Sequence, residues 1–96
     1  MLKIGSATHK VHGGKLIRVD VTHDHNAIQS IKITGDFFLH PEEALDEINE
    51  LLTGAELPLQ VEKLVQEMNL QLEIQNTQFI GASPQDIIAT LQEALS

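Results

Sequence analysis

The chain has 96 residues, enough for one domain spanning residues 1–96, because most domains contain about 50 to 250 residues. Its net charge of −8 disfavours binding to nucleic acid or to a membrane surface, and its three aromatic residues, all Phe, leave little for bases to stack on. The absence of cysteine excludes disulfides, thiol catalysis and cysteine-based zinc sites, and with no long apolar run it favours a cytoplasmic protein.

The charge is divided unevenly along the chain. Residues 1–35 hold five Lys or Arg against two Asp, a net +3, whereas residues 36–96 hold one Lys against twelve carboxylates, a net −11. This division is typical of a strand-rich segment followed by a helix-rich one. A basic surface facing an anionic ligand or an acidic partner could also produce it.

The first third of the chain predicts strands. Residues 15–21 alternate between apolar and polar side chains, and residues 27–35 repeat the pattern, as half-buried strands do. The polar segment 22–26 between them predicts an antiparallel hairpin. Residues 2–11 are rich in β-branched residues and end at the glycine pair 13–14, which completes a predicted three-strand meander.

Helical periodicity follows. Pro41 suits the first position of a helix that ends at Gly54, residues 58–69 predict a second helix, and Ser83 suits the N-cap of a third. Between the second and third helices, residues 70–74 alternate in polarity and predict a possible edge strand. The expected fold is therefore α+β: an antiparallel sheet, a three-strand meander plus a possible edge strand, covered on one face by about three helices. Its other face would be solvated and would carry Lys and Arg.

Histidine is unusually frequent near the N-terminus. His23 and His25 lie two residues apart and could share a strand face, where His9 and His12 could join them to bind a metal. Solvated loop histidines explain the same pattern, and no helical HExxH motif accompanies them, so we expect no metal site.

No catalytic residue is predicted either. Ser6, Ser30 and Ser83 lack the strand-turn-helix elbow of a nucleophilic serine, and Glu42 and Glu43 fall on an exposed helical face.

Two short motifs stand out. In the segment His12-Gly13-Gly14-Lys15 the glycines could turn backbone N–H groups toward an anion beside the lysine, although a tight turn explains the spacing as well. In the segment 35–39 two adjacent Phe residues leave a strand. Successive strand side chains face opposite ways, so one Phe is expected in the core and the other toward a helix or a partner.

Three stretches, residues 10–21, 31–43 and 81–86, carry a family resemblance. The glycine pair with its lysine, the sequence TGDFF before a helix, and GASPQD before the last helix resemble the C-terminal accessory domain of lipoate-protein ligase. In some archaea and bacteria this domain is a separate small subunit, the lipoate-protein ligase B subunit, beside a catalytic A subunit. The resemblance covers nearly the whole chain.

This resemblance implies an accessory subunit that is inactive alone. The catalytic subunit would bind ATP, Mg and lipoate, form lipoyl-AMP with the help of the small subunit, and lipoylate a lysine of an acceptor domain, which this chain would meet only indirectly. The residues expected to face the partner or the adenylate are His12, Gly13, Gly14, Lys15, Arg18, Asp36, Phe37 and Phe38. The alternative function is a binding or assembly module that dimerises through the open sheet face.

Overall fold

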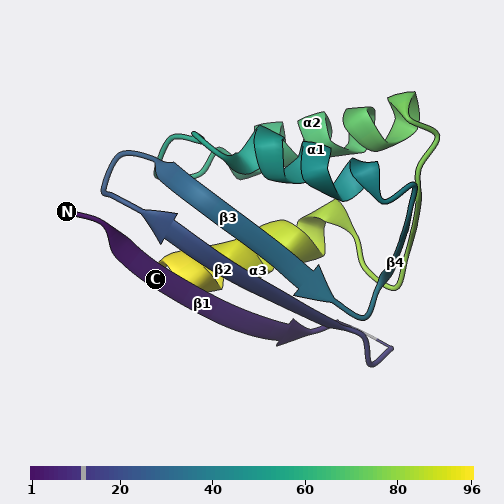
Figure 1. The fold of residues 1–96 in the computed structure, drawn as a ribbon, viewed down its shortest axis with the longest axis horizontal. Helices are drawn as coiled ribbons and strands as arrows, with labels where there is room; N and C mark the ends of the chain where they lie inside the picture. Colours follow the sequence, from purple (N-terminus) through teal and green to yellow (C-terminus); the bar gives the residue numbers. More distant parts are fainter. Residues whose placement is uncertain (12) are drawn as a thin grey trace.

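The structure is a computed structural model that describes residues 1–11 and 13–96. The elements follow in the order β1 (Lys3–Lys10), β2 (Leu16–His23), β3 (Ile28–Gly35), β4 (Phe38–His40), α1 (Glu43–Leu52), α2 (Val61–Ile74), β5 (Gln78–Ile80) and α3 (Pro84–Leu95). Figure 1 shows the strands β1 to β3 in front of α3. The α+β class predicted from the sequence is confirmed.

The predicted meander is confirmed as an antiparallel sheet in the order β1-β2-β3. The central strand β2 places Ile17, Val19 and Val21 on the buried face, where each is at most 2% exposed. The even-numbered residues of β2 face the other way. The register pairs Arg18 with Thr8 and Thr34, and Asp20 with Ser6 and Lys32, so the open face is polar, as predicted.

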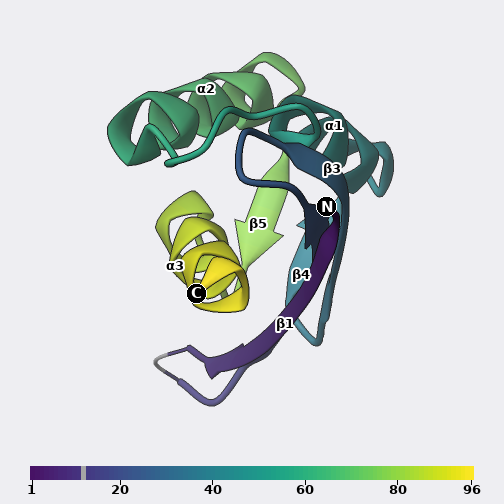
Figure 2. The same cartoon turned by 90° about the vertical axis from the view of Figure 1, so that its left-hand side faces the viewer.

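The helices form a second layer, but only two of them lie on the sheet. The helix α3 packs against β1 and β2, α1 packs against β3, and α2 packs against α1 and α3. Figure 2 shows the curved sheet wrapped around α3. This close fit depends on Gly5, because a Cβ there would lie 1.8 Å from the Ala94 carbonyl oxygen.

The third helix begins as its sequence predicts. The Ser83 side chain accepts a hydrogen bond from the Asp86 N–H at 3.3 Å, and the Asp86 carboxylate accepts one from the Ser83 N–H at 2.9 Å. This reciprocal capping box satisfies two N–H groups that the helix itself leaves unpaired. Pro84 follows as the first helical residue.

The predicted edge strand at residues 70–74 is wrong, because these residues form the last turns of α2. Leu72 continues the inward stripe of Leu64 and Met68 at a spacing of four residues, whereas Leu70 and Ile74 point outward. Alternation over five residues therefore came from two faces of one helix. The predicted helix 58–69 ends too early for the same reason. It also begins too early, because α2 starts at Val61.

Asn76 ends α2. It adopts a φ of 51°, and the N–H groups of Asn76 and Thr77 donate to the carbonyls of Glu73 and Leu72. These two bonds form a Schellman motif with Asn76 in the left-handed position that glycine usually occupies.

The first helix also begins later than predicted, at Glu43 rather than at Pro41. Between β3 and α1, residues 38–40 form β4, which pairs antiparallel with β5 in a separate two-stranded sheet. This small sheet ties the β3–α1 connection to the α2–α3 connection.

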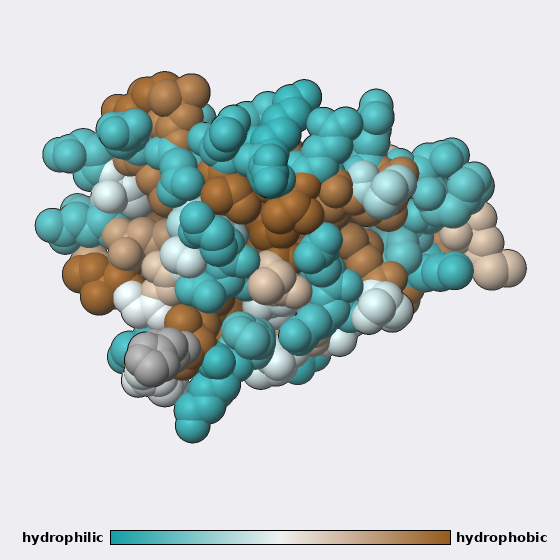
Figure 3. Space-filling view, turned by 180° about the vertical axis from the view of Figure 1, so that it is seen from behind, coloured by the Kyte–Doolittle hydropathy of each residue, from teal (hydrophilic) through white to brown (hydrophobic). Residues whose placement is uncertain are grey.

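The helical layer leaves part of the apolar interior visible. Figure 3, which views the molecule from the side opposite to Figure 1, shows a brown apolar band between hydrophilic side chains. None of the described helices is long and apolar enough to span a membrane.

Candidate functional site

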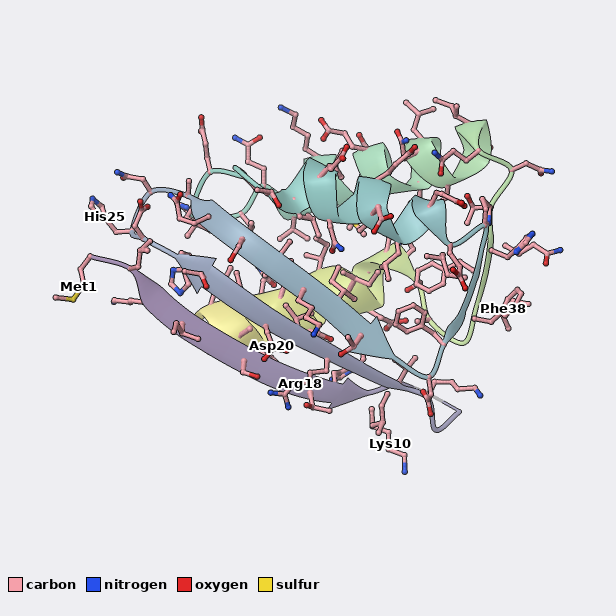
Figure 4. The ribbon with its side chains drawn as sticks, viewed as in Figure 1. Met1, Lys10, Arg18, Asp20, His25 and Phe38 are labelled. Atoms are coloured by element: carbon pink, nitrogen blue, oxygen red, sulfur yellow. The ribbon has the colours of Figure 1, made fainter. Side chains whose placement is uncertain are left out.

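Three segments that are distant in the sequence meet at one end of the molecule. We call it the turn end and define it as residues 13–16, 35–40 and 78–82. It contains most of the residues expected to face a partner. Figure 4 shows Phe38 and Lys10 at this end, with Met1 and His25 at the opposite end.

Lys15 joins the glycine turn to the segment before α3. Its Cγ lies 2.9 Å from the position a Cβ would occupy on Gly81, and its Cδ lies 3.5 Å from that position. The alkyl stem of Lys15 thus crosses the bare backbone of Gly81, which has a φ of 94°. Glycine is needed at position 81 both for this conformation and for the room it leaves to Lys15.

Asp36 fixes the neighbouring strand start. Its carboxylate accepts a hydrogen bond from the Leu16 N–H at 2.6 Å, and its own N–H donates to the Leu16 carbonyl at 3.3 Å. Asp36 therefore holds the chain directly after Lys15 in place. One of its two carboxylate oxygens is thus engaged in the fold.

The two adjacent Phe residues face opposite ways, as predicted. Phe37 packs against the core and meets Phe79 edge to face, with ring centroids 5.4 Å apart. Phe38 is 50% exposed and stacks on His40 with ring centroids 6.3 Å apart. Figure 4 shows Phe38 pointing away from the molecule.

Sequence reasoning missed the apolar neighbour of Phe38. Ile80 is its cross-strand partner in the small sheet and is 59% exposed. We call Phe38 and Ile80 the apolar cluster. The only signal for this strand in the sequence was weak, an apolar pair at positions 79 and 80 between turn residues.

The glycine pair forms a tight turn. Gly13 and Gly14 have φ values of 100° and 94°, and the Gly14 N–H donates to the Val11 carbonyl at 2.9 Å. The Val11 N–H in turn donates to the Lys15 carbonyl at 2.7 Å. The sequence left two interpretations of this segment open, a tight turn and a backbone anion site. The structure shows the tight turn, with the Gly14 N–H bonded within the loop. His12 lies outside the described residues.

Arg18 does not join the turn end. It lies on the open sheet face, where its guanidinium donates to the Asp20 carboxylate at 3.0 and 3.1 Å (Figure 4). These bonds, with one from Ser6, hold the pKa of Asp20 below its ordinary value, and the same pair raises the pKa of Arg18. The Arg18 charge is therefore already matched.

The idea of a shared histidine face is wrong for the residues that the structure describes. His23 is buried and faces the core, whereas His25 is exposed in the following turn. The register pairs His23 with Lys3 and His9 with Ile17, which separates the two along the sheet. Apart from His12, no three His, Asp or Glu side chains converge.

A hollow of about 460 Å³ lies beside Phe37, between β3, β4 and α1. Glu42 and Asp46 line it. Two carboxylates would repel the phosphates of a nucleotide, so this hollow does not suit an adenylate. The turn end combines an apolar cluster with a lysine and is suited to contact with another protein.

Comparisons with known proteins agree with this description. Residues 6–91 match the family described as bacterial lipoate protein ligase C-terminus. The chain is 31% identical over 77 residues to lipoate-protein ligase A subunit 2 of Thermoplasma acidophilum, covering 80% of this chain and 77% of that protein. It also superposes, with a TM-score of 0.75 and 31% identity, on a chain in the structure of an archaeal lipoylation system, a bipartite lipoate protein ligase and its E2 lipoyl domain from the same organism. That likeness covers 95% of this chain and 97% of the other. The chain belongs to the lipoate protein ligase C-terminus family.

Proposed function

We propose that this chain is the accessory subunit of a two-part lipoate-protein ligase. It docks on a separate catalytic subunit and is needed there for the ATP-dependent activation of lipoate to lipoyl-AMP. The activated lipoyl group is then transferred to a lysine of an acceptor domain. The relative from Thermoplasma acidophilum is named as a ligase subunit, and its structural counterpart comes from a bipartite ligase.

One observation supports the turn end as the docking surface. The three stretches that carry the family resemblance meet there through the contacts of Lys15 with Gly81 and of Asp36 with Leu16. Beside them lies the apolar cluster Phe38 and Ile80. An aromatic anchor among apolar neighbours is the usual centre of a protein interface.

The composition of the turn end indicates what this chain and the catalytic subunit each contribute. It offers a lysine and an apolar surface, and its Asp36 is already bonded to the backbone of β2. Three acidic or histidine side chains do not converge among the described residues. We assign ATP, Mg and lipoate to the catalytic subunit, as the family resemblance implies, and we assign to this chain the positive charge of Lys15 and the contact with its partner.

The open sheet face suits a homodimer interface less well. Its middle rows hold Ser6, Asp20 and Lys32 beside Thr8 and Arg18. The centres of dimer interfaces are usually apolar and depleted in charge. This face therefore favours solvent over a second copy.

The docking step is tested by mixing the chain with the ligase catalytic subunit of the same organism and measuring mass by light scattering after size exclusion. We expect a stable complex that contains both chains. Separate elution at micromolar concentrations of both proteins would refute docking.

A variant of Lys15 tests its role in activation. Negative charge builds on the phosphates during adenylation, and a lysine at an interface that excludes water stabilises it more than on open surface. We expect Lys15→Ala to slow lipoyl-AMP formation about tenfold or more at saturating partner, equivalent to about 1.4 kcal/mol of barrier. Weaker binding with an unchanged saturated rate would make Lys15 a docking residue only, and no change in either would leave it a solvated lysine.

A further inference from the structure

The outer edge of β1 is an open strand edge. In the part of the chain that the structure describes, β1 pairs with β2 and with no other strand. The sheet's other border is partly closed, because the Gly54 N–H donates to the Ile28 carbonyl and the Ile28 N–H donates to the Ala55 carbonyl. Figures 1 and 2 show β1 at the margin of the sheet.

The hydrogen-bond pattern identifies which groups face this edge. The Val11 N–H donates to the Lys15 carbonyl directly beyond the last pair of the register, Lys10 with Leu16. The odd-numbered residues of β1 therefore bond to β2. In an antiparallel pair bonded and non-bonded residues alternate, so the N–H and C=O groups of Ile4, Ser6, Thr8 and Lys10 point outward. The bond from the Asp36 N–H to the Leu16 carbonyl supports the same alternation from the β3 side.

The strand lacks the usual protection of an edge. It contains eight residues without proline, and its pairing with β2 runs without a register shift. Ile4 is 86% exposed on the open face. Natural edges are commonly shortened, bulged or covered, because a long regular edge pairs readily with another strand. Here only Lys3 and Lys10, at its two ends, carry charge.

We propose that the edge of β1 pairs antiparallel with β1 of a second copy of this chain, joining the two sheets across a twofold axis centred on Ser6. Two copies can pair only where outward-facing residues meet outward-facing residues. With the twofold axis at Ser6, the Ser6 residues of the two copies lie opposite each other. Ile4 of each copy then lies opposite Thr8 of the other. Ile4, Ser6 and Thr8 of each strand are then bonded to the other copy, while Lys10, the fourth outward-facing residue, lies opposite Leu2, which precedes β1. The exposed Ile4 gains the Thr8 methyl group as a neighbour.

Charge favours this register. It places Lys3 of one copy opposite His9 of the other, and the His9 Nδ1 lies 3.8 Å from the Glu93 carboxylate. Each Lys3 ammonium is thereby brought near a Glu93 of the other chain, and no two like charges stand directly opposite. This surface runs along β1, separate from the apolar cluster, so the second copy and the catalytic subunit do not compete for the same residues.

Cross-linking tests the geometry, because the natural chain has no cysteine. Residues opposite each other in a bonded antiparallel pair have Cα atoms about 5.5 Å apart, which a disulfide can bridge. We expect Ser6→Cys to form a covalent dimer under mild oxidation. The matched variant Ser30→Cys, an exposed serine on β3, should remain monomeric on a non-reducing gel. Equal cross-linking of both variants, or none at Ser6→Cys, would overturn the proposal.

The unmodified protein tests the bonding. We expect the isolated chain to sediment as a dimer. Thr8→Pro should weaken the dimer at least about tenfold while the chain stays folded, since it removes one outward N–H from each copy and none that bonds to β2. The control Thr8→Val keeps that N–H and should dimerise normally. A monomeric wild type, or a Thr8→Pro variant that dimerises like wild type, would refute the inference. Loss of binding to the catalytic subunit in Thr8→Pro would assign the edge to that partner instead.

Discussion

The adjacent residues Phe37 and Phe38 have different roles, one in the core and one at the surface. Phe37 fills the space beside Phe79, and Phe38 stands half exposed next to Ile80. Because one ring stabilises the fold and the other lies at the surface, truncating each should give different results.

We predict that Phe37→Ala lowers the free energy of unfolding by about 3 kcal/mol, the lower end for buried Phe because this ring is partly exposed. Phe38→Ala should change stability by no more than about 0.5 kcal/mol, as surface changes usually do. It should weaken binding to the catalytic subunit by about tenfold or more, as expected for an interface anchor. Urea unfolding and calorimetric titration measure both quantities, and two similar, mild effects would contradict the division.

Asp24 gives the turn between β2 and β3 a pH dependence. Its carboxylate accepts hydrogen bonds from the N–H groups of Asn26 and Ala27 at 2.7 and 2.9 Å, and these bonds lower its pKa. Because the pKa is lower in the folded state, the ionised carboxylate stabilises the fold at pH values above its unfolded pKa of about 3.9. This stabilisation is lost as the pH falls through the pKa of the folded state.

We therefore predict that Asp24→Asn has a lower melting temperature than wild type at pH 7, and that the difference shrinks toward about pH 2. The control is Glu50→Gln, which removes an exposed carboxylate on α1, away from this turn. Circular dichroism melts at several pH values measure the difference. A gap between Asp24→Asn and wild type that stays constant with pH would contradict the explanation.

At the scale of elements, the contact between β1 and α3 depends on one position. A Cβ on Gly5 would meet the Ala94 carbonyl oxygen at 1.8 Å, a backbone atom that cannot turn aside. We predict that Gly5→Ala lowers the free energy of unfolding by about 1 to 3 kcal/mol, the usual cost of overpacking. Denaturant unfolding measures it, with Ala7→Gly as the opposite change two residues along β1. Unchanged stability of Gly5→Ala would show that α3 does not lie so close.

Sequence patterns predicted most elements because their signals are local. Alternation located β2 and β3, and the β-branched residues before the glycine pair located β1. Ser83 with Asp86 located the start of α3, since a cap needs only neighbouring residues. The end of α2 was missed because Asn76 takes a left-handed conformation that no spacing announces. Pairing of β4 with β5 was missed for a different reason, since three-residue strands carry little pattern.

The candidate site was partly predictable. Lys15 and Phe38 stood out in the sequence, but the contact of Lys15 with Gly81 joins segments more than sixty residues apart. Arg18 was expected to face the partner or the adenylate together with them. Its side chain points to the open face, since strand residues alternate, and Asp20 two residues on takes up its charge.

For the molecule as a whole, the uneven charge has a spatial counterpart. The basic first third forms the three-stranded sheet, and most carboxylates lie on or near α1, α2 and α3. The strand and helix explanation of the two halves is therefore sufficient. The turn end joins them, since Lys15 comes from the sheet and Gly81 from the approach to α3.

The central claim is that this chain supports activation without performing it. The most direct measurement is lipoate-dependent pyrophosphate release and lipoyl-AMP formation by this chain alone, by the catalytic subunit alone and by the two together, with ATP and Mg present throughout. We predict no product from this chain alone and a rate with both chains far above that of the catalytic subunit alone. Robust adenylation by the isolated 96-residue chain, or a catalytic subunit whose rate is unchanged by adding it, would contradict the account.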